Sequence, residues 1–233
     1  MEKKVLGVLG GIGPMSSAYF YKLLTENTFA MKDQDHLDIV ISSKATTPDR
    51  TSYILGESEE NPLPIMIEEC RKMLDFGAEV IAVTCNTAHY FYEALQDALS
   101  VEVLNIGKLA VDYLMKNNIE TVGLMATTGT VQGGIYQNSC EEKKLNCIIP
   151  NKENQELVMK LIYDEIKAGK KANLDEFFTV ANELKNKGAK AIILGCTELS
   201  LIKELGILDD SFIDPLEILA KASIESCGGK LKE

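Results

Sequence analysis

The sequence lacks the features of several common classes of protein. Its apolar stretches are all shorter than the roughly 18 residues of a membrane-spanning helix. The first residues, Met1-Glu2-Lys3-Lys4-Val5, lead directly into an apolar run without the layout of a signal peptide. We therefore expect a cytoplasmic protein with no membrane-embedded segment.

Basic residues are scarce, and arginine and histidine are scarcer still. The chain has 24 Lys and Arg residues against 35 Asp and Glu residues, for a net charge of −11, and it has only two arginines and two histidines. This acidic balance argues against nucleic acid or an anionic membrane as a partner. It also means that an anionic substrate needs local basic groups around it.

Dense cysteine spacing is absent as well. The six cysteines, at positions 70, 85, 140, 147, 196 and 227, are scattered through 233 residues, which argues for reduced thiols rather than a disulfide framework. Hydrophobic residues make up 45% of the chain and charged residues 25%, as in soluble globular proteins. The length alone is compatible with one domain or with two half-sized domains.

Short apolar runs alternate with longer stretches of helical period. The runs predict strands near 4–9, 38–42, 79–83, 102–104, 120–125, 145–148, 190–194 and 212–213. This alternation predicts an α/β fold with parallel sheets. Residues 80–83 and 191–194 are apolar at every position, which suits strands covered by helices on both faces.

An internal repeat links the two halves of the chain. "GAEVIAVTC" begins at Gly77 and "GAKAIILGC" at Gly188, and in both a Gly-Ala pair starts eight residues before a cysteine. Upstream, "VLGVLGGIGP" at 5–14 has a counterpart in "TVGLMATTGT" at 121–130. The sequence therefore predicts two pseudosymmetric domains, each a parallel sheet flanked by helices, with the active site in the cleft between them.

We expect residues 1–105 and 213–233 to form the first domain, and residues 106–212 to form the second. The tail "FIDPLEILAKAS" is expected to return to the first domain as a final strand and helix. If the two domains pack about a pseudo-twofold axis, equivalent loops meet across one cleft. Cys85 and Cys196 then face each other.

Cys85 and Cys196 each stand where a strand is expected to end and a helix to begin. Backbone N–H groups and the helix dipole stabilise a thiolate at such a position, so we expect a lowered pKa for both cysteines. A thiolate on one side of a bound carbon and a thiol on the other can remove a proton from one face and return one to the opposite face. That reaction inverts a stereocentre and requires no cofactor. The candidates to hold the α-carboxylate by hydrogen bonds are Asn86, Thr87, Thr127, Thr128 and Thr197.

Seven short motifs follow one another along the chain. They are "GGIGP" at 10–14, "PDRT" at 48–51, "CNTAH" at 85–89, "ATTGT" at 126–130, "IKAG" at 166–169, "GCTEL" at 195–199 and "DP" at 214–215. In this order and spacing they resemble the cofactor-independent amino-acid racemases of the aspartate/glutamate racemase superfamily, in particular its aspartate racemase branch. The resemblance covers nearly the whole chain.

The resemblance implies that Cys85 and Cys196 are the catalytic base and acid, which exchange roles with the direction of the reaction. It places Asn86, Thr87, Thr127 and Thr197 around the α-carboxylate and amino group, and Arg50 and Lys167 around the side-chain carboxylate. Gly11, in the first motif, belongs to the expected substrate site. The resemblance also implies a homodimer, and neither a cofactor nor a metal.

Arg50 supports an acidic substrate without the resemblance, because its planar fork lies in the polar loop "TTPDRT" after a strand, where it can bind a carboxylate at two points. The alternatives are a solvated or Asp49-paired Arg50, and a Lys167 that only complements a helix dipole before Gly169. The chain departs from the glutamate racemase branch, with Gly10-Gly11 in place of an Asp-Ser pair and Glu198 in place of a histidine. We therefore expect aspartate as the substrate. A racemase that has broad specificity or accepts glutamate is the alternative.

Other classes of function have less support. A dinucleotide site at Gly11-Ile12-Gly13 lacks its third glycine, because residue 16 is Ser16, and no acidic residue ends the second strand. A zinc site built from Cys85, His89 and Cys196 is a weak alternative, since two histidines and no paired-cysteine spacing are available. A decarboxylase or maleate isomerase of the same superfamily, or an amino-acid-binding protein without catalysis, are further alternatives.

Overall fold

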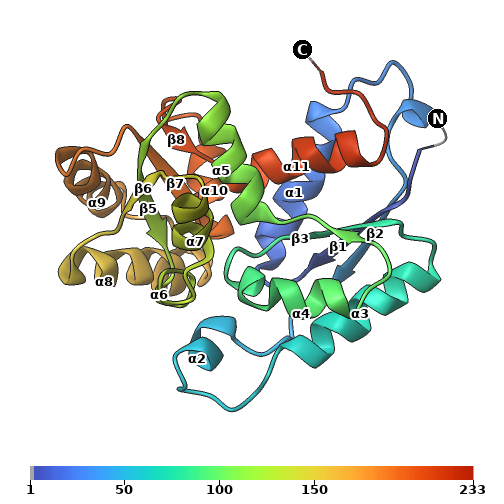
Figure 1. Ribbon diagram of the computed structural model, residues 1–233, viewed down its shortest axis with the longest axis horizontal. Helices are drawn as coiled ribbons and strands as arrows, with labels where there is room; N and C mark the ends of the chain where they lie inside the picture. Colours follow the sequence, from blue (N-terminus) through green and yellow to red (C-terminus); the bar gives the residue numbers. More distant parts are fainter. Residues whose placement is uncertain (1–2, 233) are drawn as a thin grey trace.

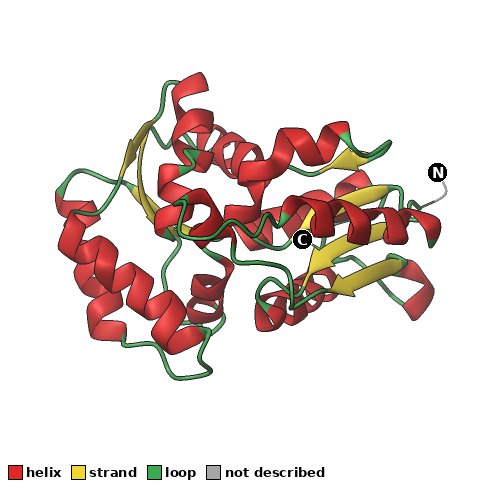
Figure 2. Cartoon of the chain, turned by 90° about the horizontal axis from the view of Figure 1, so that it is seen from below, coloured by secondary structure: helices red, strands yellow, loops and turns green. Residues whose placement is uncertain are grey.

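The computed structural model describes residues 3–232. The chain forms two halves, each built on one four-stranded parallel sheet, and Figure 2 shows the two sheets as separate groups of strands with helices around them. None of the helices in the described part of the chain is both long and apolar enough to cross a membrane.

The first half contains β1 to β4 and the helices between them (Figure 1). Its elements are β1 (Leu6–Gly10), α1 (Pro14–Asn27), η1 (Asp33–Asp35), β2 (Ile39–Ser43), α2 (Arg50–Ile54), α3 (Leu63–Asp75), β3 (Val80–Val83), η2 (Thr87–Phe91), α4 (Tyr92–Asp97), β4 (Glu102–Val103) and α5 (Ile106–Lys116).

The second half repeats this plan. Its elements are β5 (Thr121–Ala126), α6 (Thr128–Gln132), α7 (Ile135–Glu142), β6 (Asn146–Ile148), α8 (Lys152–Lys160), the π-helical turn η3 (Leu161–Ile166), α9 (Leu174–Asn186), β7 (Ala191–Gly195), α10 (Thr197–Lys203), β8 (Phe212–Ile213) and α11 (Pro215–Ser226). All eight strands lie where the apolar runs predict them.

The two sheets have the same strand order. The first runs β2-β1-β3-β4 and the second β6-β5-β7-β8, with every pair parallel. The central strands β1, β3 and β7 are buried at every residue, because helices cover both faces of each sheet. The α/β class and the two similar sheets confirm the fold predicted from the repeat.

The repeated glycines have the same structural role in each half. Gly77 and Gly188 follow α3 and α9 with φ values of +93° and +102°, so each turns the chain in a conformation that residues with a side chain rarely adopt. Gly7 and Gly123 lie in the central strands, where a helix packs directly on the backbone. The repeated sequence therefore encodes one helix–turn–strand unit twice.

The last helix of each half crosses to the other half. Helix α11 follows the second sheet, yet its residues Leu216, Leu219 and Ile224 join the core of the first sheet. Residues of α5, among them Val111 and Leu114, join the core of the second sheet. The two helices pack against each other at the junction, where Figure 1 shows α11 beside α5 and α1. This exchange ties the two halves together.

The tail differs in part from the expectation. Its helix α11 does pack on the first half, but its strand does not, because Phe212 and Ile213 pair with Ile192 and Ile193 of the second sheet. The prediction that the strand joins the first domain is wrong. The division of the chain at residues 105 and 212 stays a prediction.

Replacing Gly123 with Ala should destabilise the fold more than replacing Gly7. A methyl group on Gly123 would lie 2.9 Å from Leu184 Cβ, next to the backbone of α9, so the helix must shift. On Gly7 it would lie 2.6 Å from Ile81 Cδ1, the end of a side chain that can rotate, and its nearest rigid neighbour, Ala78 Cβ, would be slightly farther away at 3.0 Å. We expect Gly123→Ala to lower the free energy of unfolding in urea by about 1–3 kcal/mol. Equal unfolding midpoints for the two variants would contradict this packing argument.

Candidate active site

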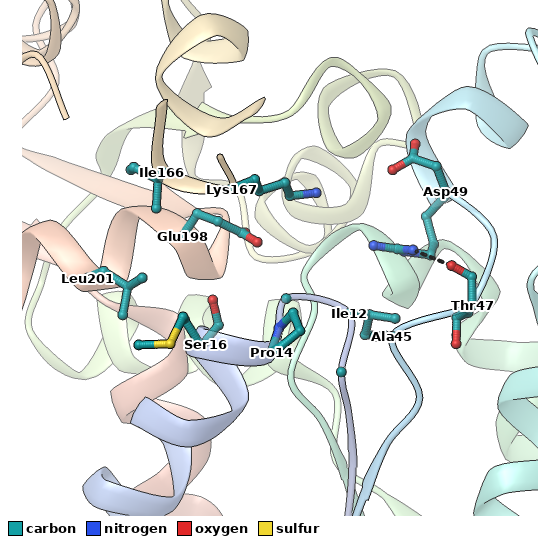
Figure 3. Close-up of a pocket in the computed structure, with 14 residues that line it drawn as sticks. Ile12, Pro14, Ser16, Ala45, Thr47, Asp49, Ile166, Lys167, Glu198 and Leu201 are labelled. Atoms are coloured by element: carbon teal, nitrogen blue, oxygen red, sulfur yellow. Dashed lines mark hydrogen bonds between the residues drawn. The ribbon is translucent and has the colours of Figure 1, made fainter. Parts of the chain in front are cut away.

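A cavity of about 410 Å³ opens between the two halves. The loops after β1 and β2 line it from the first half, and the ends of η3 and α10 line it from the second (Figure 3). Its lining residues are Gly11, Ile12, Gly13, Pro14, Met15, Ser16, Ala45, Thr47, Asp49, Arg50, Ile166, Lys167, Glu198 and Leu201. Four charged side chains, two basic and two acidic, therefore share one small cavity.

The two cysteines follow equivalent central strands. Cys85 lies two residues after β3, and Cys196 directly follows β7, where it caps α10. Both are free thiols, 7% and 6% exposed. Lys167 lies close to both: burial opposes its charge, but the neighbouring Glu198, Cys196 and Cys85 raise the pKa of Lys167. The two thiols therefore lie around the same cation.

Arg50 is buried at the start of α2, with 7% of its surface exposed. Its Nη1 donates to the carbonyl oxygens of Pro48 at 2.8 Å and Thr47 at 3.3 Å. Its buried Nε has no hydrogen-bond partner among residues 3–232. Burial opposes its charge, while Cys85 and Asp49 raise the pKa of Arg50. The guanidinium therefore has a free donor, and Cys85 is among its near neighbours. The interpretation of Arg50 as a solvated surface residue is wrong.

Glu198 is a site residue that the sequence reasoning missed. Its Oε2 accepts hydrogen bonds from Cys196 Sγ at 2.9 Å and from Thr197 Oγ1 at 3.4 Å. Gly13 faces its Oε1, and a side chain there would overlap the carboxylate. Figure 3 shows the side chains of Glu198 and Lys167 both directed into the pocket. The motif "GCTEL" contains Glu198, but only its distance from Cys196 reveals the contact.

Cys196 does not have the lowered pKa expected at a helix N-terminus. Burial and the nearby Glu198 carboxylate raise the pKa of the Cys196 thiol well above its ordinary value, although Lys167 opposes this effect. The prediction is wrong because seven residues of helix α10 supply a weak dipole, whereas a buried like charge acts at hydrogen-bond distance. The side chain of Cys196 is therefore a protonated thiol at neutral pH.

Three threonine hydroxyls join the two halves beside the cysteines. Thr87 Oγ1 lies 3.0 Å from Thr127 Oγ1 and 2.9 Å from Thr130 Oγ1, and the latter two are 3.0 Å apart. Asn86 Oδ1 accepts a hydrogen bond from the Tyr136 hydroxyl. Asn86 is 2% exposed, and its Nδ2 has no hydrogen-bond partner in the described part of the chain. That amide therefore has two free donors.

Three of the ten residues expected at the site line this cavity, and its lining does not include Cys85, Cys196, Asn86, Thr87 or Thr127. Gly11, Arg50 and Lys167 line the cavity, and Thr197 contacts the lining residue Glu198. Thr128 does not line this cavity. It lines a second cavity, of about 560 Å³, and its Oγ1 accepts a hydrogen bond from Gln155 at 3.4 Å. Asp49 and Thr130 are additions that the sequence reasoning did not place at the site.

His89 is directed away from the cavity. Its ring nitrogens lie 2.9 Å from the Cys85 carbonyl oxygen and 3.3 Å from that of Leu104. Burial lowers the pKa of the imidazole. Within residues 3–232, no group of three His, Cys, Asp or Glu side chains is arranged to hold a metal ion. His89 therefore has a structural contact in place of the zinc-ligand role considered above.

The fold and the two cysteines at equivalent strand ends define a two-sheet α/β protein with a charged cavity between its halves. The family described as Asp/Glu/Hydantoin racemase matches residues 9–223. An aspartate racemase from Picrophilus torridus has 30% sequence identity and a TM-score of 0.83 over 98% of this chain and 96% of that chain. This chain belongs to the Asp/Glu/hydantoin racemase family.

Two further relatives extend over almost the full length. An aspartate racemase homologue from Pyrococcus horikoshii OT3 is 27% identical, with a TM-score of 0.77 over 97% of this chain and 99% of that chain. The broad specificity amino-acid racemase RacX of Bacillus subtilis (strain 168) is 26% identical, and the match covers 95% of this chain and 97% of RacX. The relatives thus include one described as an aspartate racemase and one described as a broad specificity amino-acid racemase.

Removing the charge of Glu198 should make Cys196 more reactive. Glu198→Gln replaces a carboxylate with a neutral group of the same shape, which lowers the pKa of the Cys196 thiol because it removes the like charge. We expect alkylation of Cys196 by iodoacetamide near pH 8 to accelerate about tenfold, as for one unit of pKa. Peptide mass spectrometry over a pH series measures the rate at this residue.

Glu204→Gln is the matched control, because this substitution removes the same negative charge at the exposed far end of α10. The control should label Cys196 at the wild-type rate. An unchanged rate in Glu198→Gln as well would show that its carboxylate does not act on the thiol.

Proposed function

We propose that this protein is a cofactor-independent amino-acid racemase that acts on aspartate with Cys85 and Cys196 as its two proton-transfer groups. The observation that carries the proposal is that two buried cysteines, from equivalent strand ends of two similar sheets, both lie near Lys167, which lines one cavity together with Arg50. Membership of the racemase family supports the reaction class.

In the proposed reaction, one proton leaves the α-carbon of the substrate and another proton is added to the opposite face of that carbon. The Cys85 thiolate takes the α-proton from one face of the substrate, which forms an S–H bond and leaves the C–H electron pair on the α-carbon. Hydrogen bonds to the α-carboxylate stabilise that charge as it spreads onto the carboxylate oxygens. The Cys196 thiol then donates its proton to the opposite face and becomes a thiolate. The reverse reaction exchanges the two roles.

The charges around the two cysteines favour this starting state. Arg50 lies near Cys85, so a cation is among the neighbours of that cysteine. Glu198 accepts the hydrogen bond of Cys196, and its negative charge together with burial keeps that sulfur protonated. Each thiol therefore has a neighbour suited to one of the two protonation states. The scheme uses side chains alone and needs no cofactor.

Two free groups in the site suit the α-carboxylate and the side-chain carboxylate. The Asn86 amide has free donors, the next residue Thr87 contacts Thr127, and Thr197 contacts Glu198. We assign Asn86 and these three threonines to the α-carboxylate and amino group. Arg50 has an unpaired Nε, and we assign it with Lys167 to the side-chain carboxylate. This division favours an amino acid with two carboxylates.

Two alternatives share the same site. The likeness to RacX favours a racemase of broad specificity, and a racemase that accepts glutamate belongs to the same alternative. An amino-acid-binding protein without catalysis would use the same cleft. An assay of a panel of amino acids in deuterated water, with chiral separation and no added cofactor, distinguishes the three, because binding alone exchanges no α-proton. The homodimer and the cytoplasmic location stay predictions.

Replacing either cysteine with serine should reduce racemisation of aspartate by about 10²- to 10⁴-fold, since a positioned acid or base contributes that much. Cys85→Ser and Cys196→Ser should each retain slow α-proton exchange of one enantiomer, because the remaining thiol still serves its own face. Chiral chromatography and mass spectrometry of the α-deuterium content measure both reactions. Two-way racemisation by the double variant would exclude the mechanism.

Arg50→Ala should reduce kcat/KM for aspartate by about 2–4 kcal/mol, roughly 30- to 1000-fold, because the side-chain carboxylate loses a charge-assisted partner in a partly desolvated cleft. A neutral amino acid such as alanine should lose far less. Arg71→Ala, which removes the only other arginine from an exposed position on α3, is the control and should change neither value. Equal losses for aspartate and alanine in Arg50→Ala would contradict the assignment.

A further inference from the structure

One hydrogen bond joins the two halves at the edge of the cavity. The Tyr163 hydroxyl, on η3 of the second half, donates to the Asp49 carboxylate at the start of α2 in the first half. The hydroxyl lies 3.2 Å from Oδ2 and 3.4 Å from Oδ1. Neither residue takes part in the proton transfers described above, so this contact has no role yet.

Both partners are in the protonation state that makes the contact strong. Burial raises the pKa of the Tyr163 hydroxyl to about 12, so it is a donor throughout the neutral range. Burial opposes ionisation of Asp49, but the Ser52 backbone N–H and the charges of Arg50 and Lys167 lower the pKa of its carboxyl. A neutral hydroxyl therefore donates to a carboxylate, which is a charge-assisted hydrogen bond.

Each partner also holds one of the two cations of the cavity. Asp49 directly precedes Arg50 and caps α2 by accepting from the Ser52 backbone N–H at 2.8 Å. The Lys167 ammonium lies over the Tyr163 ring, 4.1 Å from its centre. Asp49 is thus joined to Arg50 along the chain at the start of α2, and through the Tyr163 hydroxyl and ring it is linked to Lys167 across the junction of the two halves.

We infer that the Asp49–Tyr163 hydrogen bond is a positioning contact that fixes the separation of Arg50 and Lys167, and so sets the preference of the site for an amino acid with a side-chain carboxylate. The inference rests on the proposed function, because it assigns a role within the same site. Binding energy for a dicarboxylate depends on two cations at a fixed distance, whereas a neutral amino acid does not use that distance.

The fold does not depend on this one hydroxyl. Helix α2 also packs directly on α6, where a methyl group on Gly129 would lie 2.8 Å from Thr51 Cα. Tyr163→Phe keeps the ring beneath Lys167 and removes only the bridge. Asp49→Asn keeps a residue that caps helices well and removes only the charge. Both variants therefore test the contact with little disturbance around it.

We expect Tyr163→Phe to raise KM for aspartate about tenfold, within the range for loss of a hydrogen bond to a charged group, and to change kcat less than twofold. Values for alanine, if it is a substrate, should change less than twofold. Asp49→Asn should act in the same direction. Tyr113→Phe, at an exposed tyrosine of α5, is the matched control and should behave as the wild type.

The decisive comparison is made in the Arg50→Ala background. If Tyr163 acts through the position of Arg50, Tyr163→Phe should have almost no further effect on aspartate there. A loss of the same size in both backgrounds, or equal losses for aspartate and alanine, would overturn the inference while leaving the racemase proposal intact.

Calorimetric titration with aspartate and with alanine gives the same comparison without turnover. A wild-type protein that binds aspartate but racemises no amino acid would contradict the proposed function, and the selectivity of binding in Tyr163→Phe would still decide the role of the bridge. A wild-type protein that does not bind aspartate would overturn both.

Discussion

The parallel pairing of every strand is the constraint on which the site depends. Because all strands of a parallel sheet end at the same edge, the loops after β1, β2 and β3 gather at one edge of the first sheet, and those after β5 and β7 at one edge of the second. The exchanged helices α5 and α11 then bind the two halves together. The cavity forms where the loops after β1 and β2 meet the ends of η3 and α10, so the sheets supply its position and these segments its chemistry.

The internal repeat builds two similar strand ends, and the residues beside them make the two chemically different. Asn86 and Thr87 follow the first cysteine, whereas Thr197 and Glu198 follow the second. Arg50, from helix α2, lies near Cys85, whereas the Glu198 carboxylate accepts a hydrogen bond from Cys196. Lys167, near both sulfur atoms and near Glu198, offsets negative charge on either side.

The sequence predicts the eight strands because a strand covered on both faces must be apolar at nearly every position. It predicts that Cys85 and Cys196 lie at strand ends because the apolar runs stop just before them. It does not predict that Phe212 and Ile213 pair with the second sheet, because a two-residue strand has no partner signal of its own. The sequence also does not predict the raised pKa of Cys196 or the Asp49–Tyr163 hydrogen bond. The pKa depends on the distance between Cys196 and Glu198 within one helical turn, and the bridge depends on two side chains that are remote in sequence. The roles of Arg50 and Lys167 toward the side-chain carboxylate come largely from the family resemblance.

The measurement that tests the central claim most directly is the fate of the α-proton during the first part of the reaction in deuterated water. With one enantiomer of aspartate as the substrate, a two-thiol mechanism places solvent deuterium on the α-carbon of the product, while the substrate that has not reacted keeps its original proton. We predict that early product is deuterated and that remaining substrate is not. Product that retains the substrate's own proton, or substrate that gains deuterium as fast as product forms, would indicate a single group acting on both faces and would contradict the account.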